Sequence, residues 1–123
     1  MTPIGLTRED RDDTTVITVS GSVDVYTAPR LRELLKSIPE DGTAPVSLVA
    51  DLDGVTFLDG TGVGVLVGAM RAQEARGGRF GIVCSAEPVV RVLRTMGLLG
   101  RMGVCGSTDG ATRAVRGEGS EPR

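Results

Sequence analysis

One segment, residues 46–52 (VSLVADL), limits the choice of fold more than any other. It is nearly continuous in apolar residues and lacks the alternation of a strand that has one face in water. Such a segment is typical of a central strand covered on both faces, so it predicts a sheet with helices packed against it. The chain has 123 residues, 40% of them apolar, which suffices for one domain with its own core.

The segments before this strand carry strand and helix signals in turn. Alternation predicts an edge strand at residues 4–9, and β-branched residues predict a second strand at residues 14–20, which ends at Gly21-Ser22. Leucines at helical spacing then predict a helix with Thr27 as its N-cap.

The segments after the central strand repeat this pattern. A turn is expected at Asp53-Gly54, followed by residues 55–58 (VTFL) and then the polar residues 59–62. A helix is predicted over about residues 61–76, where Gly77-Gly78 ends it. The remaining elements follow in chain order: a strand at residues 80–84, a short helix that Ser85 caps and Gly97 ends, a strand at residues 102–105, and a helix from Ser107 or Thr108 to Val115.

This order of elements, β-β-α-β-α-β-α-β-α, predicts a single α/β domain over residues 1–116. Its sheet should be mixed, with four to five strands packed against about four helices. Residues 117–123 are Gly, Glu, Ser, Pro and Arg, with nothing to bury, and are expected to form a disordered tail.

Composition excludes several classes of function. The chain has no histidine, which removes the commonest general base and the Ser-His and Cys-His nucleophiles. Cys84 and Cys105 lie in apolar stretches, so we expect buried, reduced thiols and no metal site. A net charge of −2 and few aromatic residues argue against nucleic acid and anionic lipid as partners. The longest apolar stretch, near residues 63–70, is too short to span a bilayer, so we expect a cytoplasmic protein. We also expect it to work without a cofactor.

Residues 51–55 (DLDGV), directly after the central strand, resemble the first motif of the haloacid-dehalogenase phosphatases. That resemblance implies Asp51 as nucleophile, Asp53 as acid/base and Mg²⁺ held between them. The chemistry also needs a lysine and further acidic ligands downstream, whereas Lys36 lies upstream in a predicted helix. A motif outside its context is weak evidence, and a polar turn at a strand end is the simpler interpretation.

Four glycines, Gly60, Gly62, Gly64 and Gly68, raise the question of a phosphate-binding loop. They fit neither the dinucleotide fingerprint nor the Gly-Lys-Ser/Thr of a P-loop. A tight strand-to-helix turn explains them better, although nucleotide binding there stays open.

Two further segments, residues 21–29 (GSVDVYTAP) and residues 57–64 (FLDGTGVG), together resemble the anti-sigma-factor antagonists of the STAS domain family. The family pattern is Gly-x-hydrophobic-Asp after the second strand, and then hydrophobic-Asp-Ser-Ser/Thr-Gly-hydrophobic-Gly opening a helix. The match covers roughly residues 4–115 and keeps the order of strands and helices.

The resemblance implies a regulatory binding protein rather than an enzyme. Its partner would be an anti-sigma factor of the serine-kinase type, with an ATPase-like fold, which releases its sigma factor when the antagonist binds. In the family the kinase phosphorylates the serine after the turn aspartate and so ends the complex. This chain has Gly60 at that position, so phosphorylation is either lost or moved to Thr61, whose simpler role is that of a helix N-cap. The chain is expected to be a monomer or weak dimer.

The resemblance and the positions in the chain place the partner-binding residues on two loops at one end of the sheet. They are Ser22, Asp24, Tyr26, Thr27, Asp59, Gly60, Thr61, Gly62 and Val63. Two alternatives remain at this stage: a STAS module within a larger sensory complex, and a phosphatase that uses Asp51 and Asp53.

Overall fold

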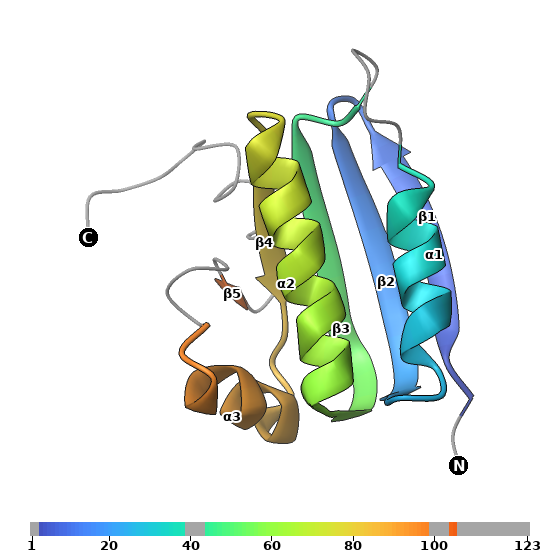
Figure 1. Ribbon diagram of the computed structural model, residues 1–123, viewed down its shortest axis with the longest axis vertical. Helices are drawn as coiled ribbons and strands as arrows, with labels where there is room; N and C mark the ends of the chain where they lie inside the picture. The colour runs from blue at the N-terminus through green and yellow to red at the C-terminus, as the bar shows by residue number, and fades with distance from the viewer. Residues whose placement is uncertain (1–2, 39–43, 99–103, 106–123) are drawn as a thin grey trace.

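A five-stranded sheet lies at the centre of the molecule, with its strands in the order β1-β2-β3-β4-β5 (Figure 1). The structure is a computed structural model that describes residues 3–38, 44–98 and 104–105. β1 is antiparallel to β2, and every other neighbouring pair is parallel, so the sheet is mixed as predicted. The strands are β1 (Gly5–Arg11), β2 (Thr14–Val23), β3 (Ser47–Leu58), β4 (Arg79–Val83) and β5 (Val104–Cys105).

Three helices accompany the sheet in the described part of the chain. α1 (Ala28–Lys36) and α2 (Gly60–Ala75) lie side by side over one face, and α3 (Glu87–Thr95) packs against β3 near the end where α2 begins (Figure 1). The predicted fourth helix and the predicted tail fall outside the described residues, as does most of the strand expected at 102–105.

The central strand is buried on both faces, which confirms the prediction from residues 46–52. Leu48 of β3 faces the helices and is 1% exposed, whereas its neighbour Val49 faces the other way and is 0% exposed. Leu48 belongs to the main core together with Leu31 of α1 and Leu66 of α2. Val49 forms a second, smaller cluster with Val16 and Val83.

β2 and β3 are longer than predicted. Gly21-Ser22 and Asp53-Gly54 resemble turns in the sequence, but in the structure both pairs lie inside strands, where they accompany irregular pairing. The β2–β3 register shifts between Thr18 and Ser20 and again between Gly21 and Ser22. Gly21 has a φ of 84°. A Cβ on Gly54 would lie 2.9 Å from the Cβ of Ser20, so glycine lets the two backbones approach. The expected strand end at Gly21-Ser22 and the expected turn at Asp53-Gly54 were therefore wrong.

The helix ends follow the prediction at their C-termini more closely than at their N-termini. Gly77 (φ 81°) and Gly97 (φ 73°) follow α2 and α3, as expected for left-handed C-terminal positions. Ser85 does not cap α3, whose N-cap position is Ala86 without a side-chain cap. Thr27 occupies the N-cap position of α1, but its side chain makes no capping bond.

Buried or partly buried polar groups join elements that are distant in sequence. Gln73 of α2 is 0% exposed, and its amide donates to the carbonyl oxygens of Pro45 (3.0 Å) and Val46 (3.2 Å) just before β3. Its own oxygen accepts from the Nε of Arg76 at 3.0 Å. This side chain therefore ties the end of α2 to the start of β3.

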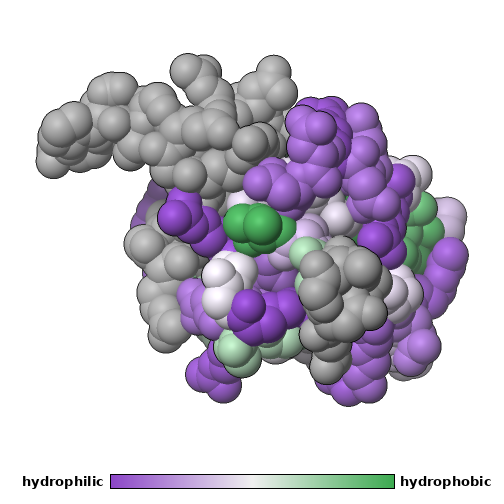
Figure 2. All heavy atoms as spheres, turned by 90° about the horizontal axis from the view of Figure 1, so that it is seen from above, coloured by the Kyte–Doolittle hydropathy of each residue, from purple (hydrophilic) through white to green (hydrophobic). Residues whose placement is uncertain are grey.

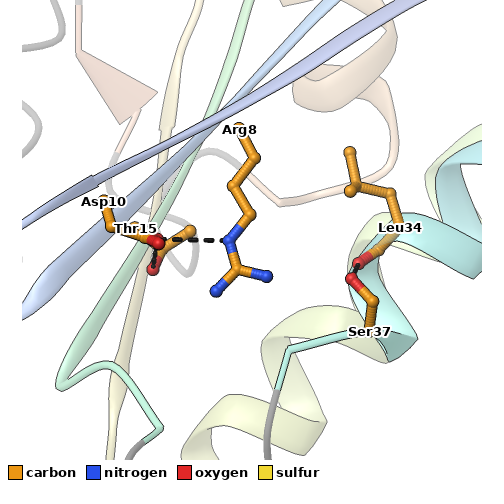
Figure 3. A network of polar contacts seen from close by, with 5 residues as sticks. All are labelled: Arg8, Asp10, Thr15, Leu34 and Ser37. Carbon is orange, nitrogen blue, oxygen red and sulfur yellow. Dashed lines mark hydrogen bonds and ion pairs between the residues drawn. The ribbon is translucent and has the colours of Figure 1, made fainter.

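A polar network borders the core along the outer strand, beside α1 (Figure 3). Asp10 accepts a hydrogen bond from the Thr15 hydroxyl at 2.8 Å and another from the Nε of Arg8 at 3.1 Å. These two bonds, the one from Thr15 first, lower the pKa of the Asp10 carboxyl. Nearby, the Ser37 hydroxyl donates to the carbonyl of Leu34 at 2.6 Å and closes the last turn of α1.

Cys84 is buried and free, as predicted, and burial is the main cause that raises the pKa of its thiol. The side chain of Cys105 lies outside the part of the chain that the structure describes.

Candidate functional site

The two sequence motifs meet at the edge of the sheet where β2 and β3 end and α1 and α2 begin (Figure 1). β2 and β3 are parallel neighbours, and Val23 pairs with Leu58 at their carboxyl ends. The backbone N–H of Asp59 donates to the carbonyl of Val23 at 3.2 Å, which joins the two loops. We call this end of the sheet, with the loops after β2 and β3, the carboxyl edge.

Asp24 and Thr27 fix the shape of the first loop. The carboxylate of Asp24 accepts from the backbone N–H groups of Tyr26 (2.9 Å) and Thr27 (3.1 Å). The hydroxyl of Thr27 donates to the carbonyl of Ser22 at 2.8 Å and accepts from the N–H of Asp24 at 2.9 Å. These bonds hold a compact turn and leave the Tyr26 side chain 77% exposed.

Asp59 is the N-cap of α2, although Thr61 was expected there. Its carboxylate accepts from the N–H of Gly62 at 3.0 Å, and its carbonyl accepts from the N–H of Val63 at 3.0 Å. A carboxylate at this position satisfies an otherwise free helix donor and complements the positive end of the helix dipole. Thr61 is the second residue of the helix and is exposed.

Gly62 and Val63 shape the carboxyl edge from the inside. A Cβ on Gly62 would lie 2.6 Å from Cδ1 of Leu58 and 2.7 Å from Cγ1 of Val23, so glycine alone fits there. Val63 is 2% exposed. Both residues therefore position the start of α2, and neither presents a side chain to a partner.

Gly60 differs from Gly62 because it faces open space. No heavy atom outside its own neighbourhood lies within 4 Å of a Cβ built on Gly60. A side chain at this position would therefore project freely from the carboxyl edge.

Sequence reasoning missed two exposed apolar side chains at this edge, Val25 and Phe57. Val25 is 56% exposed and Phe57 is 52% exposed. Phe57 pairs with Ser22 and immediately precedes the inward Leu58, so strand alternation turns its ring outward. Together with Tyr26 they give the carboxyl edge three exposed large apolar side chains. At the opposite end, seen in Figure 2, the described surface is mostly hydrophilic.

Asp51 and Asp53 occupy the middle of β3 rather than a loop beyond it. Asp53 accepts from the N–H (2.7 Å) and hydroxyl (3.0 Å) of Ser85, and Asp51 accepts from the N–H of Asp53 at 3.0 Å. The two bonds from Ser85 connect β3 to the segment before α3, and the bond to Asp51 lies within β3, so both carboxylates have structural roles. No group of three His, Cys, Asp or Glu side chains within the described ranges could hold a metal ion.

The described helices include none with the length and hydropathy needed to cross a bilayer.

Comparison with known proteins gives one family. Residues 6–111 match the STAS domain. The anti-sigma-B factor antagonist of Staphylococcus aureus is 31% identical over 93 residues, which are 76% of this chain and 84% of that protein. The protein of the same name from Bacillus subtilis is 30% identical over 79% of this chain and 86% of its own length.

Solved structures agree with this assignment. An anti-sigma factor antagonist from Mycobacterium paratuberculosis superposes with a TM-score of 0.82 at 32% identity, covering 92% of this chain and 94% of that one. The unphosphorylated anti-sigma factor antagonist SpoIIAA has a TM-score of 0.76 at 25% identity, covering 94% of this chain and all (100%) of that one. The chain therefore belongs to the STAS domain family, in a branch of regulatory binding proteins and not of enzymes.

Proposed function

We propose that this chain is an anti-sigma-factor antagonist, which binds an anti-sigma factor and thereby frees a sigma factor for transcription. The observation that carries the proposal is the similarity, over most of both chains, to bacterial proteins of that name. The resemblance of the sequence motifs further implies a partner of the serine-kinase type with an ATPase-like fold.

The carboxyl edge is the proposed docking surface. Exposed apolar side chains at this edge supply the contact area that a protein interface buries, and tyrosine is a residue type enriched at the centre of interfaces. Ser22, Asp24, Asp59 and Thr61 supply a polar rim. Thr27, Gly62 and Val63 keep the loops and the start of α2 in place.

Control by phosphorylation is proposed to be absent at its usual place. Gly60 has no hydroxyl, and α2 carries the next hydroxyl, that of Thr61, about 100° around the helix and about 1.5 Å along it. A kinase that presents its phosphate to position 60 would therefore meet the Thr61 oxygen in the wrong place. We infer that the complex persists in the presence of ATP.

Serine substitutions at exposed apolar residues test the docking surface. Tyr26→Ser and Phe57→Ser should each raise the Kd for the anti-sigma factor about tenfold or more, because each removes apolar contact area from the interface. The Kd is measured by isothermal titration calorimetry with the anti-sigma factor that is recovered bound to the chain from its native cell.

Val46→Ser is the matched control, since Val46 is 50% exposed and precedes β3 at the opposite end of the strand. It should leave the Kd unchanged. Equal Kd values for all three variants and the wild type would place the interface elsewhere. Recovery of the chain only in a large assembly without an anti-sigma factor would favour the sensory-module alternative.

A further inference from the structure

A groove of about 330 Å³ lies between α1 and α2, away from the carboxyl edge. It runs beside the second half of α1 and along α2 from Gly64 to Arg76, a distance of roughly 18 Å at the rise of an α-helix. Gly64, Gly68 and Leu35 contribute to its apolar lining, and Arg32, Lys36 and Arg76 contribute three positive charges.

The glycines on the α2 side are not explained by packing within the described molecule. Gly64 and Gly68 are exposed and lie one helical turn apart, where glycine lowers helix stability relative to alanine. A Cβ built on either would meet no neighbouring heavy atom within 4 Å. Their effect is to leave the backbone of α2 open to close approach from outside.

The charges on the groove are of one sign. Arg32 and Lys36 are exposed and stand four residues apart on α1, where like charges repel. Within the described residues neither forms an ion pair, and no carboxylate lines the groove. Arg76 adds a third cation at the far end, with its Nε bonded to the oxygen of Gln73. The groove thus offers an apolar lining with a positive border, in which Arg32 and Lys36 have no ion-pair partner among the described residues.

We propose that this groove is a second docking surface, and that it binds an acidic amphipathic helix of a partner protein. Small residues on α2 admit the close packing of a third helix, whose apolar face would lie over Gly64 and Gly68. Aspartate or glutamate side chains beside that face would reach Arg32 and Lys36. The length of the groove matches about three turns of helix. This surface is separate from the carboxyl edge and does not depend on the function proposed there.

Site-specific photo-crosslinking of the full chain in its native cell tests the proposal. The probe is p-benzoylphenylalanine at position 72, because Ala72 is exposed and lines the groove. Mass spectrometry then identifies the crosslinked residue. We expect a protein adduct within a helical segment rich in aspartate and glutamate.

Two charge-reversal pairs separate the groove from the general charge of the chain. The pair Arg32→Glu and Lys36→Glu should reduce the adduct about tenfold or more. The control pair, Arg30→Glu on α1 and Arg71→Glu on α2, makes the same change in net charge at exposed residues outside the groove, and should leave the adduct within about twofold of the wild type. Circular dichroism of each variant checks that it folds.

The other outcomes overturn the proposal. These are the absence of a protein adduct at position 72, a lipid or fatty-acid adduct, a segment without acidic side chains, or an equal effect of the two pairs. A parallel probe at Tyr26 reports on the carboxyl edge, so its failure counts against the proposed function alone.

Discussion

The glycines at the start of α2 have different physical roles, although the sequence presents them as one motif. Gly62 lies against Val23 and Leu58 with no room for a Cβ, whereas Gly60 and Gly64 face open space. Gly62 is therefore required by packing. Gly60 and Gly64 are sites where a side chain is sterically allowed.

Alanine substitutions should separate these roles. Gly62→Ala should lower the free energy of unfolding by about 1–3 kcal/mol, because a methyl group must displace the Val23 and Leu58 side chains. Gly64→Ala should raise the free energy of unfolding by up to about 1 kcal/mol through helix propensity. Urea unfolding followed by circular dichroism measures both, and a Gly62→Ala protein as stable as the wild type would contradict the packing argument.

Gly60→Ser tests the loss of phosphorylation control. A serine here would project from the carboxyl edge at the family's acceptor position, so we expect it to become phosphorylated and the complex to dissociate. The kinase should phosphorylate Thr61 of the wild type at least about a hundredfold more slowly than the serine of the Gly60→Ser variant, because the Thr61 hydroxyl is misplaced. Intact-mass spectrometry after incubation with the kinase and Mg-ATP measures both, with Gly60→Ala as control. Rapid, stoichiometric phosphate on wild-type Thr61 would mean that the switch had moved by one residue.

At the scale of elements, Gln73 shows how one buried amide joins a helix to a strand. Gln73→Leu keeps a similar volume but removes the donor to Pro45 and Val46. We expect it to lower the free energy of unfolding by about 1–3 kcal/mol, because the carbonyl of Pro45 loses its bond. Gln73→Glu is a second variant, expected to destabilise as well since it replaces the donor by a charge. Wild-type stability for Gln73→Leu, measured in urea, would show that water replaces the amide.

The sequence pattern predicts the order of the elements well and their limits less well. The continuous apolar segment that predicted the buried β3 and the glycines that predicted the ends of α2 and α3 are local signals, which the sequence contains in full. The irregularity at Gly54 depends instead on the approach of Ser20 from another strand, which no local pattern contains. The N-cap of α2 was misplaced because both Asp59 and Thr61 are good capping residues. In the structure Asp59 is the residue that caps, because its carboxylate accepts from the N–H of Gly62.

The candidate site was predicted in the same uneven way. Parallel strands bring their carboxyl ends together, so two motifs far apart in sequence could be assigned to one edge. Val25 and Phe57 escaped notice because an apolar residue in a strand or beside it is usually interpreted as core. Their exposure follows only from the side of the sheet that each faces.

At the scale of the whole molecule, the two surfaces have different chemistry and lie at different places. The carboxyl edge exposes Tyr26 and Phe57 next to the capped start of α2. The groove between α1 and α2 carries positive charge and an open helix backbone. The two proposals together predict that this small domain contacts two partner segments at once.

Displacement of a sigma factor tests the central claim most directly. A fluorescently labelled sigma factor is bound to the anti-sigma factor, the chain is added with Mg-ATP, and fluorescence anisotropy follows release. The wild type should release the sigma factor when it is added at a concentration equal to that of the anti-sigma factor. Tyr26→Ser and Phe57→Ser should each need a concentration about tenfold or more above that of the wild type, and Val46→Ser should need the same concentration as the wild type. No release by the folded wild-type chain, at concentrations where it binds the anti-sigma factor, would contradict the account.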